Sequence, residues 1–360
     1  MQATQKINRR QTGFSLVELL VGLVIGLFAT LVIMQIFSAF EGQKRSTSGA
    51  ADTQTNGAIA LMYLQRSLQS AGFGMPMPNT DLNNNVLKCT SNIDIFPVEV
   101  QDGAGSNGSD KLIVRYSTGS AGMVPINIDN VTNVSPGMLV TNNIGCGSDL
   151  EMSNATYQAK YRDPNDATDS KAPNRLMIMA GNTCAFAEIA AQPTNTLTGQ
   201  SYIRLHDIAS LPFAPAVGNK LACMGAWGDY TYEINNNNEL ELNGDAILSG
   251  VVAMQVQYGI SAAPGLNEVT QWVDAVGAWA APVVPARNRI KAVRVSLALR
   301  NGLKEKTEVT SAAPEAWTDA GTTLGSMSVA HLADWKNYRY RVVSTSVPLR
   351  NMLWSWRAVQ

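Results

Sequence analysis

An uncharged segment near the N-terminus limits what this chain can fold into more than any other feature. Leu19–Phe40 holds 22 residues without a charge, whereas the first 13 residues carry three basic residues and no acid. As a helix rising about 1.5 Å per residue, Phe14–Phe40 would be about 40 Å long, enough to cross a hydrocarbon core of about 30 Å. The basic residues in front favour a cytoplasmic N-terminus, so the remainder of the chain is expected to face outward.

This segment differs from an ordinary secretory signal. The apolar run is longer than a signal needs, and no A-x-A cleavage site follows Phe40. Glu18 lies inside the apolar block, where an unpartnered acid costs a few kcal/mol and is therefore a functional candidate. The alternative is structural: Ser15-x-x-Glu18 also has the form of a capping box, and an acid in the first turn suits the helix dipole.

The residues Gly13-Phe14-Ser15-Leu16-Val17-Glu18-Leu19-Leu20 resemble the class III signal of type IV prepilins and type II secretion pseudopilins. The resemblance implies that a prepilin peptidase removes the leader, residues 1–13, by cutting between Gly13 and Phe14. It also implies N-methylation of Phe14 and retention of the helix as the filament core. We expect the Glu18 carboxylate to neutralise the Phe14 amine of a neighbouring subunit, since neither charge is stable alone in a helical bundle.

A long helix is expected over residues 14–73, with residues 14–40 in the membrane. Apolar residues continue at helical spacing beyond Glu41, and their stripe should pack against a sheet. The glycine, aspartate and asparagine pairs in Ser48–Gly57 weaken the helix, so a break or kink is predicted there. Gly72 and Gly74 should end the helix.

The rest of the chain is predicted to be rich in β-strands, in a region 74–245 and a C-terminal antiparallel sheet region 246–360. Residues 229–234 and 239–242 predict a hairpin. Apolar and polar residues alternate over residues 252–260, 293–300 and 338–342, which predicts strands with one buried and one polar face. The connections 261–289 and 301–335 either pack as loops, lack order or contact neighbouring subunits. The expected fold class is α+β: a long N-terminal helix packed on an antiparallel β-rich domain.

The four cysteines, Cys89, Cys146, Cys184 and Cys223, are even in number, and the oxidising compartment beyond the inner membrane favours disulfides. Three pairings are open, and Cys89–Cys146 with Cys184–Cys223 is preferred because each closes a local loop. The chain has no C-x-x-C and only two histidines, so no zinc site is expected, nor any other metal or cofactor.

Four segments in the C-terminal third resemble the PilW family of type IV pilus minor pilins: Val256-x-Tyr258-Gly259, Trp272–Trp279, Val293–Arg300 and Arg341–Asn351. The resemblance implies an inner-membrane minor pilin that joins other minor pilins and the major pilin and primes pilus assembly. It also implies a final position at the pilus tip, beneath an adhesin-like protein. The alternative is a J-type minor pseudopilin of a type II secretion system.

Other classes of protein fit the sequence less well. No Walker loop, G-x-S-x-G or H-E-x-x-H motif is present, so an enzyme is not expected. The net charge of −1 and pI near 6.2 give no basic field for nucleic acid. The basic residues between 287 and 294 are expected to line a solvated or subunit-facing strand surface. An anchored receptor without an assembly role would not be cut at Gly13.

Overall fold

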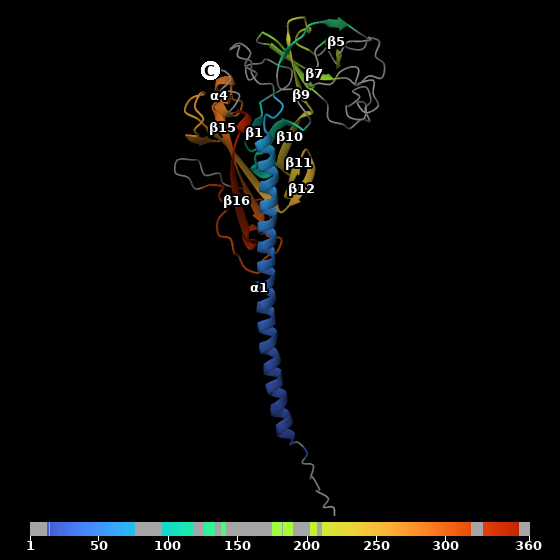
Figure 1. Cartoon of the computed structure of the whole chain (residues 1–360). Coiled ribbons are helices and arrows are strands. Elements are labelled where there is room, and N and C mark those ends of the chain that lie inside the picture. The colour runs from blue at the N-terminus through green and yellow to red at the C-terminus, as the bar shows by residue number, and fades with distance from the viewer. Residues whose placement is uncertain are drawn as a thin grey trace, which may run out of the picture. The chain divides into compact units, whose positions relative to one another are not determined.

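The structure is a computed structural model. It describes residues 13, 15–75, 96–118, 125–133, 138–141, 175–181, 183–189, 202–206, 211–317 and 327–352. The chain divides into two compact units, Met1–Asp52 and Thr53–Gln360. Figure 1 shows the chain, with α1, α4 and several of the strands labelled.

One helix, α1 (Leu16–Ser70), runs without interruption for 55 residues. The predicted break within Ser48–Gly57 is therefore wrong. Gly57 serves a packing purpose instead, because a Cβ placed there would lie 3.1 Å from Cγ1 of Val343. The predicted end of the helix is confirmed: Gly72 and Gly74 follow α1 with φ values of +76° and +86°, which favour glycine.

The described residues of the second unit form three antiparallel sheets, which together with α1 confirm the α+β class. The five-stranded sheet has the order β1 (Val98–Gln101), β2 (Lys111–Ser117), β10 (Trp227–Ile234), β11 (Glu239–Leu242), β12 (Asp245–Ser249). The four-stranded sheet has the order β14 (Gln271–Val273), β13 (Val251–Ile260), β15 (Ile290–Arg300), β16 (Tyr340–Pro348). The seven-stranded sheet has the order β3 (Ile126–Asn127), β9 (Lys220–Gly225), β6 (Arg175–Ala180), β7 (Thr183–Ile189), β8 (Tyr202–His206), β5 (Met138–Thr141), β4 (Val131–Asn133). Short helices are η2 (Ser106–Gly108), η4 (Gly277–Trp279), α4 (Val284–Arg287) and η5 (Trp335–Asn337).

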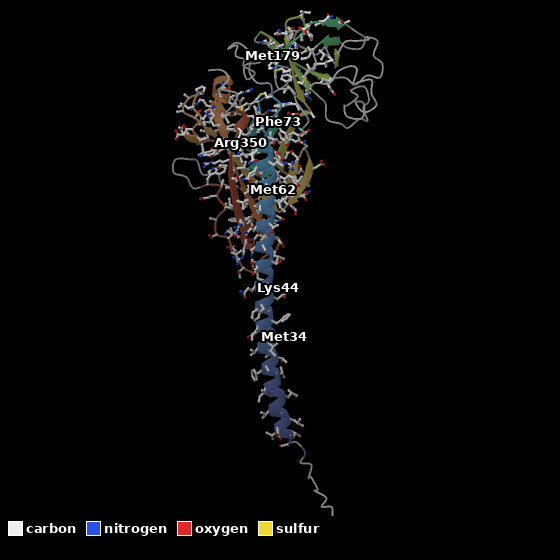
Figure 2. All side chains as sticks on the ribbon, in the orientation of Figure 1. Met34, Lys44, Met62, Phe73, Met179 and Arg350 are labelled. Atoms are coloured by element: carbon white, nitrogen blue, oxygen red, sulfur yellow. The ribbon has the colours of Figure 1, made fainter. Side chains whose placement is uncertain are left out.

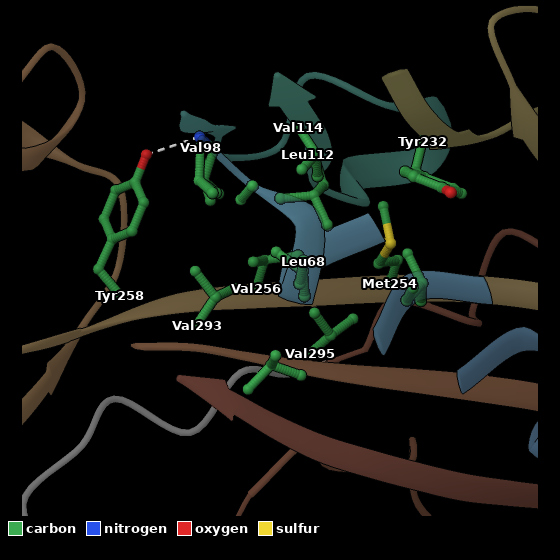
Figure 3. Close-up of a cluster of buried hydrophobic side chains, with 14 of the residues drawn as sticks. Leu68, Val98, Leu112, Val114, Tyr232, Met254, Val256, Tyr258, Val293 and Val295 are labelled. Atoms are coloured by element: carbon green, nitrogen blue, oxygen red, sulfur yellow. Dashed lines mark hydrogen bonds between the residues drawn. The ribbon is translucent and has the colours of Figure 1, made fainter. Parts of the chain in front are cut away.

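The C-terminal half of α1 supplies one wall of the main core. Leu64 and Leu68 are completely buried and belong to one apolar cluster with strands of the five- and four-stranded sheets. Figure 3 shows Leu68 among Leu112 of β2 and Val256 of β13. Burial of a leucine side chain contributes about 2 kcal/mol, so this stripe holds α1 on the sheets as predicted. The predicted hairpin of residues 229–234 and 239–242 is also confirmed, as β10 and β11.

The four-stranded sheet is covered on both faces. A polar outer face was predicted from the alternation in β13 and β15, and this prediction is wrong: Arg294 and Ser296 of β15 are buried. The face that was predicted to be polar is covered by the connection between β15 and β16. Trp317 and Met327 of this connection form an apolar cluster with Ala298. This part of the connection therefore packs as a loop on its own sheet.

Asp110 fastens the β1–β2 hairpin to the four-stranded sheet. Its backbone N–H donates to the carbonyl of Met254 in β13 at 2.9 Å. Its carboxylate accepts the N–H of Gly103 at 2.9 Å and that of Val256 at 2.7 Å. Asp110 is only 1% exposed, and nothing in the local sequence pattern distinguishes it from an ordinary turn residue. This buried carboxylate is therefore one of the links between the two sheets.

This carboxylate should make the protein less stable as the pH rises. Burial raises the pKa of Asp110 from 3.8 to about 7; the backbone N–H groups of Gly103 and Val256 lower it, and Asp102 and Asp274 raise it. A raised carboxyl pKa stabilises the fold below pH 3.8, and this contribution is lost as the pH rises through about 7. Three pKa units correspond to about 4 kcal/mol. Thermal unfolding of the full chain in detergent between pH 4 and pH 8 should show this decline.

The same titration with Asp110→Asn should give a flatter curve, because the buried titrating group is gone. Asp245→Asn provides the matched control, since Asp245 is an exposed carboxylate on β12. A variant at Asp110 that keeps the full pH dependence would show that other groups cause it.

Candidate functional site: the N-terminal helix and the β-rich body

The start of α1 leaves the Glu18 carboxylate available. The N–H groups of Glu18 and Leu19 donate to the Ser15 carbonyl at 3.0 and 3.1 Å, which closes the first turn. Among the described residues, this turn is held by that carbonyl and not by a side-chain cap of the kind a capping box would supply. Glu18 is exposed, and within the described part of the chain its carboxylate has no hydrogen-bond or ion-pair partner. Gly13 is described, whereas Phe14 lies outside the described residues.

The segment that follows Glu18 presents apolar side chains all round. The large apolar residues described between Leu16 and Phe40 are exposed, Leu16 and Met34 each to 73%. Figure 2 shows Met34 projecting from α1. A Cβ placed on Gly22 or Gly26 would meet no other atom within 4 Å, so both glycines leave room for close approach. The helix is long and apolar enough to cross a membrane, and its exposed surface suits lipid or other helices rather than water.

Polar contacts lock the C-terminal half of α1 to the sheets. The amide of Gln65 donates to the Thr345 hydroxyl of β16 at 2.5 Å, and the amide of Asn351 donates to the Ala71 carbonyl at 2.8 Å. In each of these two hydrogen bonds, the partners are 280 positions apart in the sequence. The side of α1 that faces away from the sheets is exposed to solvent, as shown by Met62, which is 59% exposed (Figure 2). Within the second unit, α1 is thus one rigid element of the body.

Two family models match the chain. Residues 8–34 match the prokaryotic N-terminal methylation motif, which includes Glu18 and the start of the apolar segment. Residues 228–351 match the model for type IV pilus-assembly protein W, PilW. The chain therefore carries a PilW domain and an N-terminal methylation motif, a combination consistent with a type IV pilin family member. The resemblance inferred from the sequence is confirmed, and the motif and apolar helix indicate membrane anchoring and association with a pilus. No curated protein and no solved structure matches the chain.

One basic residue of the PilW domain, Arg294, is buried inside the body. The guanidinium of Arg294 lies over the rings of Trp272 and Trp317, with its Cζ 4.8 and 4.4 Å from the ring centroids. Its Nε donates to the Gln257 side chain at 2.8 Å, and Gln257 in turn donates to Asp274 at 2.5 Å. Stacking on two aromatic rings and a hydrogen bond compensate the buried charge. This arrangement clamps both long connections of the PilW domain onto β15.

Three neighbouring basic residues, Arg287, Arg289 and Lys291, also contact groups within the body. Arg287 lies over the Phe96 ring at 4.9 Å and Arg289 over the Trp279 ring at 5.4 Å. Lys291 is 2% exposed and donates to a backbone carbonyl at 3.1 Å, and burial lowers its pKa. The prediction that these residues line a solvated or subunit-facing surface is therefore wrong for Lys291 and Arg294.

Cys184 and Cys223 do not pair with each other as predicted. Cys184 of β7 lies opposite Met179 of β6, and Cys223 of β9 lies opposite Leu176. Cys184 packs with Met179 on one face of the seven-stranded sheet, and Cys223 packs with Leu176 on the other. A disulfide requires Cβ atoms about 4 Å apart, whereas two strands separated by a third lie about 9.5 Å apart. The predicted Cys184–Cys223 disulfide is therefore wrong.

Both of these cysteines are nevertheless disulfide-bonded. The remaining cysteines of the chain, Cys89 and Cys146, lie outside the described residues. The predicted Cys89–Cys146 disulfide therefore lies outside the described residues and stays a prediction. The preference for a short loop failed for Cys184 and Cys223 because they occupy opposite faces of one sheet.

Proposed function

We propose that this chain is a minor pilin that joins other minor pilins in the inner membrane, primes assembly of a type IV pilus and is incorporated at its tip. The single observation that carries the proposal is the exposed apolar helix, whose Glu18 has no partner among the described residues, attached to a body with a PilW domain. Such a helix is not stable in water, and its carboxylate is not stable in lipid without a partner. Both requirements are met when the helix enters a bundle of similar helices.

The proposed sequence of events begins with hydrolysis of the Gly13–Phe14 peptide bond by a prepilin peptidase at the cytoplasmic face. Hydrolysis frees the Phe14 amine, which is then N-methylated and remains cationic near neutral pH. Glu18 of one subunit pairs with the Phe14 amine of its neighbour, which sets the axial register of the two helices. The basic leader keeps the N-terminus in the cytoplasm and places the body in the periplasm.

The remaining contacts follow from the architecture. The apolar segment of α1 would pack against the helices of other minor pilins and of the major pilin. The β-rich body would contact neighbouring bodies and, at the tip, an adhesin. We propose no catalytic step for the chain itself: its role is noncovalent assembly.

An in-frame deletion strain tests this function. Pili sheared from its surface should fall below detection and should return when the wild-type chain is supplied again. Unchanged pili would overturn the priming role. In that case, stalled release of exoproteins in the same strain would identify the chain as a J-type pseudopilin of type II secretion.

A further inference from the structure

The seven-stranded sheet occupies a single interruption of another sheet. Its strands β3–β9 all lie in the chain between β2 and β10, which are paired neighbours in the five-stranded sheet. Ser117 at the end of β2 lies opposite Trp227 at the start of β10, and the Thr118 N–H donates to the Ala226 carbonyl at 3.1 Å. The chain therefore leaves β2 and returns to β10 side by side, as it would at the turn of a hairpin.

The strands β3–β9 have an apolar core of their own. The cluster that contains Leu176, Ile178 and Leu205, each completely buried, draws all its members from residues 126–223. The main core combines α1 with the five- and four-stranded sheets, and no described residue of β3–β9 belongs to it. The packing of strands shows the same division, because β10 packs on β13 whereas β3–β9 pack closely with one another. An apolar core of its own is the mark of a separate domain.

A smaller cluster joins the two parts. It packs Met75, which follows α1, and Trp227 of β10 against Met179 of β6 and Met224 of β9. Trp227 is only 1% exposed, so the contact is dry. Methionine side chains are flexible and adapt to the surface that they contact. We therefore expect this cluster to dock the two parts on each other rather than to fold them together.

The family matches avoid the strands between β2 and β10. The PilW model covers residues 228–351, which begin at the second residue of β10, and the methylation motif covers residues 8–34. Neither range includes a residue of β3–β9. The matched part of the body, β10 to β16, instead belongs to the two sheets that share the main core.

We propose that the strands β3–β9 form an inserted domain that folds separately from the rest of the chain and that pilus assembly does not use. This inference rests on the proposed function and assigns it to the remainder, which holds α1 and the five- and four-stranded sheets. An insertion is tolerated at the tip of a hairpin because the two flanking strands stay paired. The inserted domain is then free to carry a second function, since changes to its surface leave the main core intact.

Native-state hydrogen exchange of the full chain in detergent tests the separation directly. At rising concentrations of urea below the unfolding transition, N–H groups that open in one cooperative step come to share one dependence on urea. We expect the N–H groups of β6, β7 and β9 to share one dependence, and those of β2, β10 and β15 to share another. One dependence common to both sets of strands would overturn the proposal.

A matched pair of core substitutions sharpens this measurement. Ile178 lies in the core of the inserted domain and Ile290 in the main core, and both are completely buried. Ile178→Ala should speed exchange in β6, β7 and β9 at least about thirtyfold and leave β2, β10 and β15 unchanged. Ile290→Ala should do the reverse. Faster exchange of both sets of strands in either variant would show that the two parts unfold together.

The yield of sheared pili tests whether assembly needs the inserted domain. Ile178→Asp places a carboxylate without a partner in the core of this domain and should unfold it within the full chain. In a strain that lacks its main periplasmic protease, pili should stay at the wild-type level, whereas the matched Ile290→Asp should reduce them to the level of the deletion strain. Loss of pili from Ile178→Asp would contradict the proposal, as would loss of that variant from the membrane fraction.

Failure of this inference and failure of the proposed function give different results. If deletion of the whole chain leaves pili unchanged, the priming role is wrong, but two separate dependences on urea still identify the inserted domain. If deletion abolishes pili and exchange shows a single dependence, the priming role stands and the strands β3–β9 are not a separate domain.

Discussion

Replacing Glu18 with alanine should leave the chain cut after Gly13 but largely remove it from the fibre. If Glu18 pairs with Phe14 as we propose, the change leaves the neighbour's Phe14 amine without its counter-charge in the bundle of helices. Loss of one partner of a buried ion pair costs about 3–5 kcal/mol. At about 1.4 kcal/mol per factor of ten, the equilibrium for adding the subunit should fall at least about a hundredfold. Sheared pili should therefore drop nearly to the level of the deletion strain.

The measurement separates assembly from processing. Mass spectrometry of the membrane fraction should show mature Glu18→Ala chain with a methylated Phe14, and immunoblots of sheared pili should show little of it. Glu18→Gln should behave alike, because it keeps the size of the side chain and removes its charge. Glu41→Ala is the matched control, since Glu41 is the next acid along α1 and follows the apolar segment. Normal pili from Glu18→Ala would rule out the charge pair.

The features that the sequence predicted well are those set by local pattern. The uncharged segment after Glu18 correctly predicted the helix α1. Gly72 correctly predicted where the helix ends, because few residues other than glycine adopt a positive φ. The alternation of apolar and polar residues over 252–260 and 293–300 correctly predicted the strands β13 and β15. These signals need only the periodicity of a helix or strand and the conformational freedom of glycine.

The predictions that failed depend on contacts between distant residues. Gly57 looked like a helix breaker, but a close-packed Val343, nearly 300 residues later, makes glycine suitable there. Arg294 looked like a solvent-facing strand residue, but Trp317 of a distant connection covers it. The disulfide partners of Cys184 depend on strand register, which fixes the face of each cysteine. No local pattern carries this information.

Gly74→Ala should be among the most destabilising single-methyl changes in the body. Gly74 has a φ of +86°, and a Cβ there would lie 2.5 Å from Cβ of Ser117 and 2.9 Å from the Met224 carbonyl oxygen. The positive φ costs about 1–2 kcal/mol for alanine. Displacing β2 or the backbone of β9 adds about 1–3 kcal/mol. A total of about 2–5 kcal/mol should lower the melting temperature of the full chain in detergent by about 3–8 °C, because the entropy of unfolding grows with chain length.

Gly218→Ala separates the two contributions. Gly218 has nearly the same φ, +85°, but no atoms lie within 4 Å of a Cβ placed there. This control therefore carries the backbone cost alone and should lower the melting temperature by less than Gly74→Ala does. Equal losses from the two variants would show that the contact with Ser117 and Met224 relaxes at no cost. A larger loss at Gly74 means that the chain leaving α1 is held between β2 and β9 by close packing that admits only glycine.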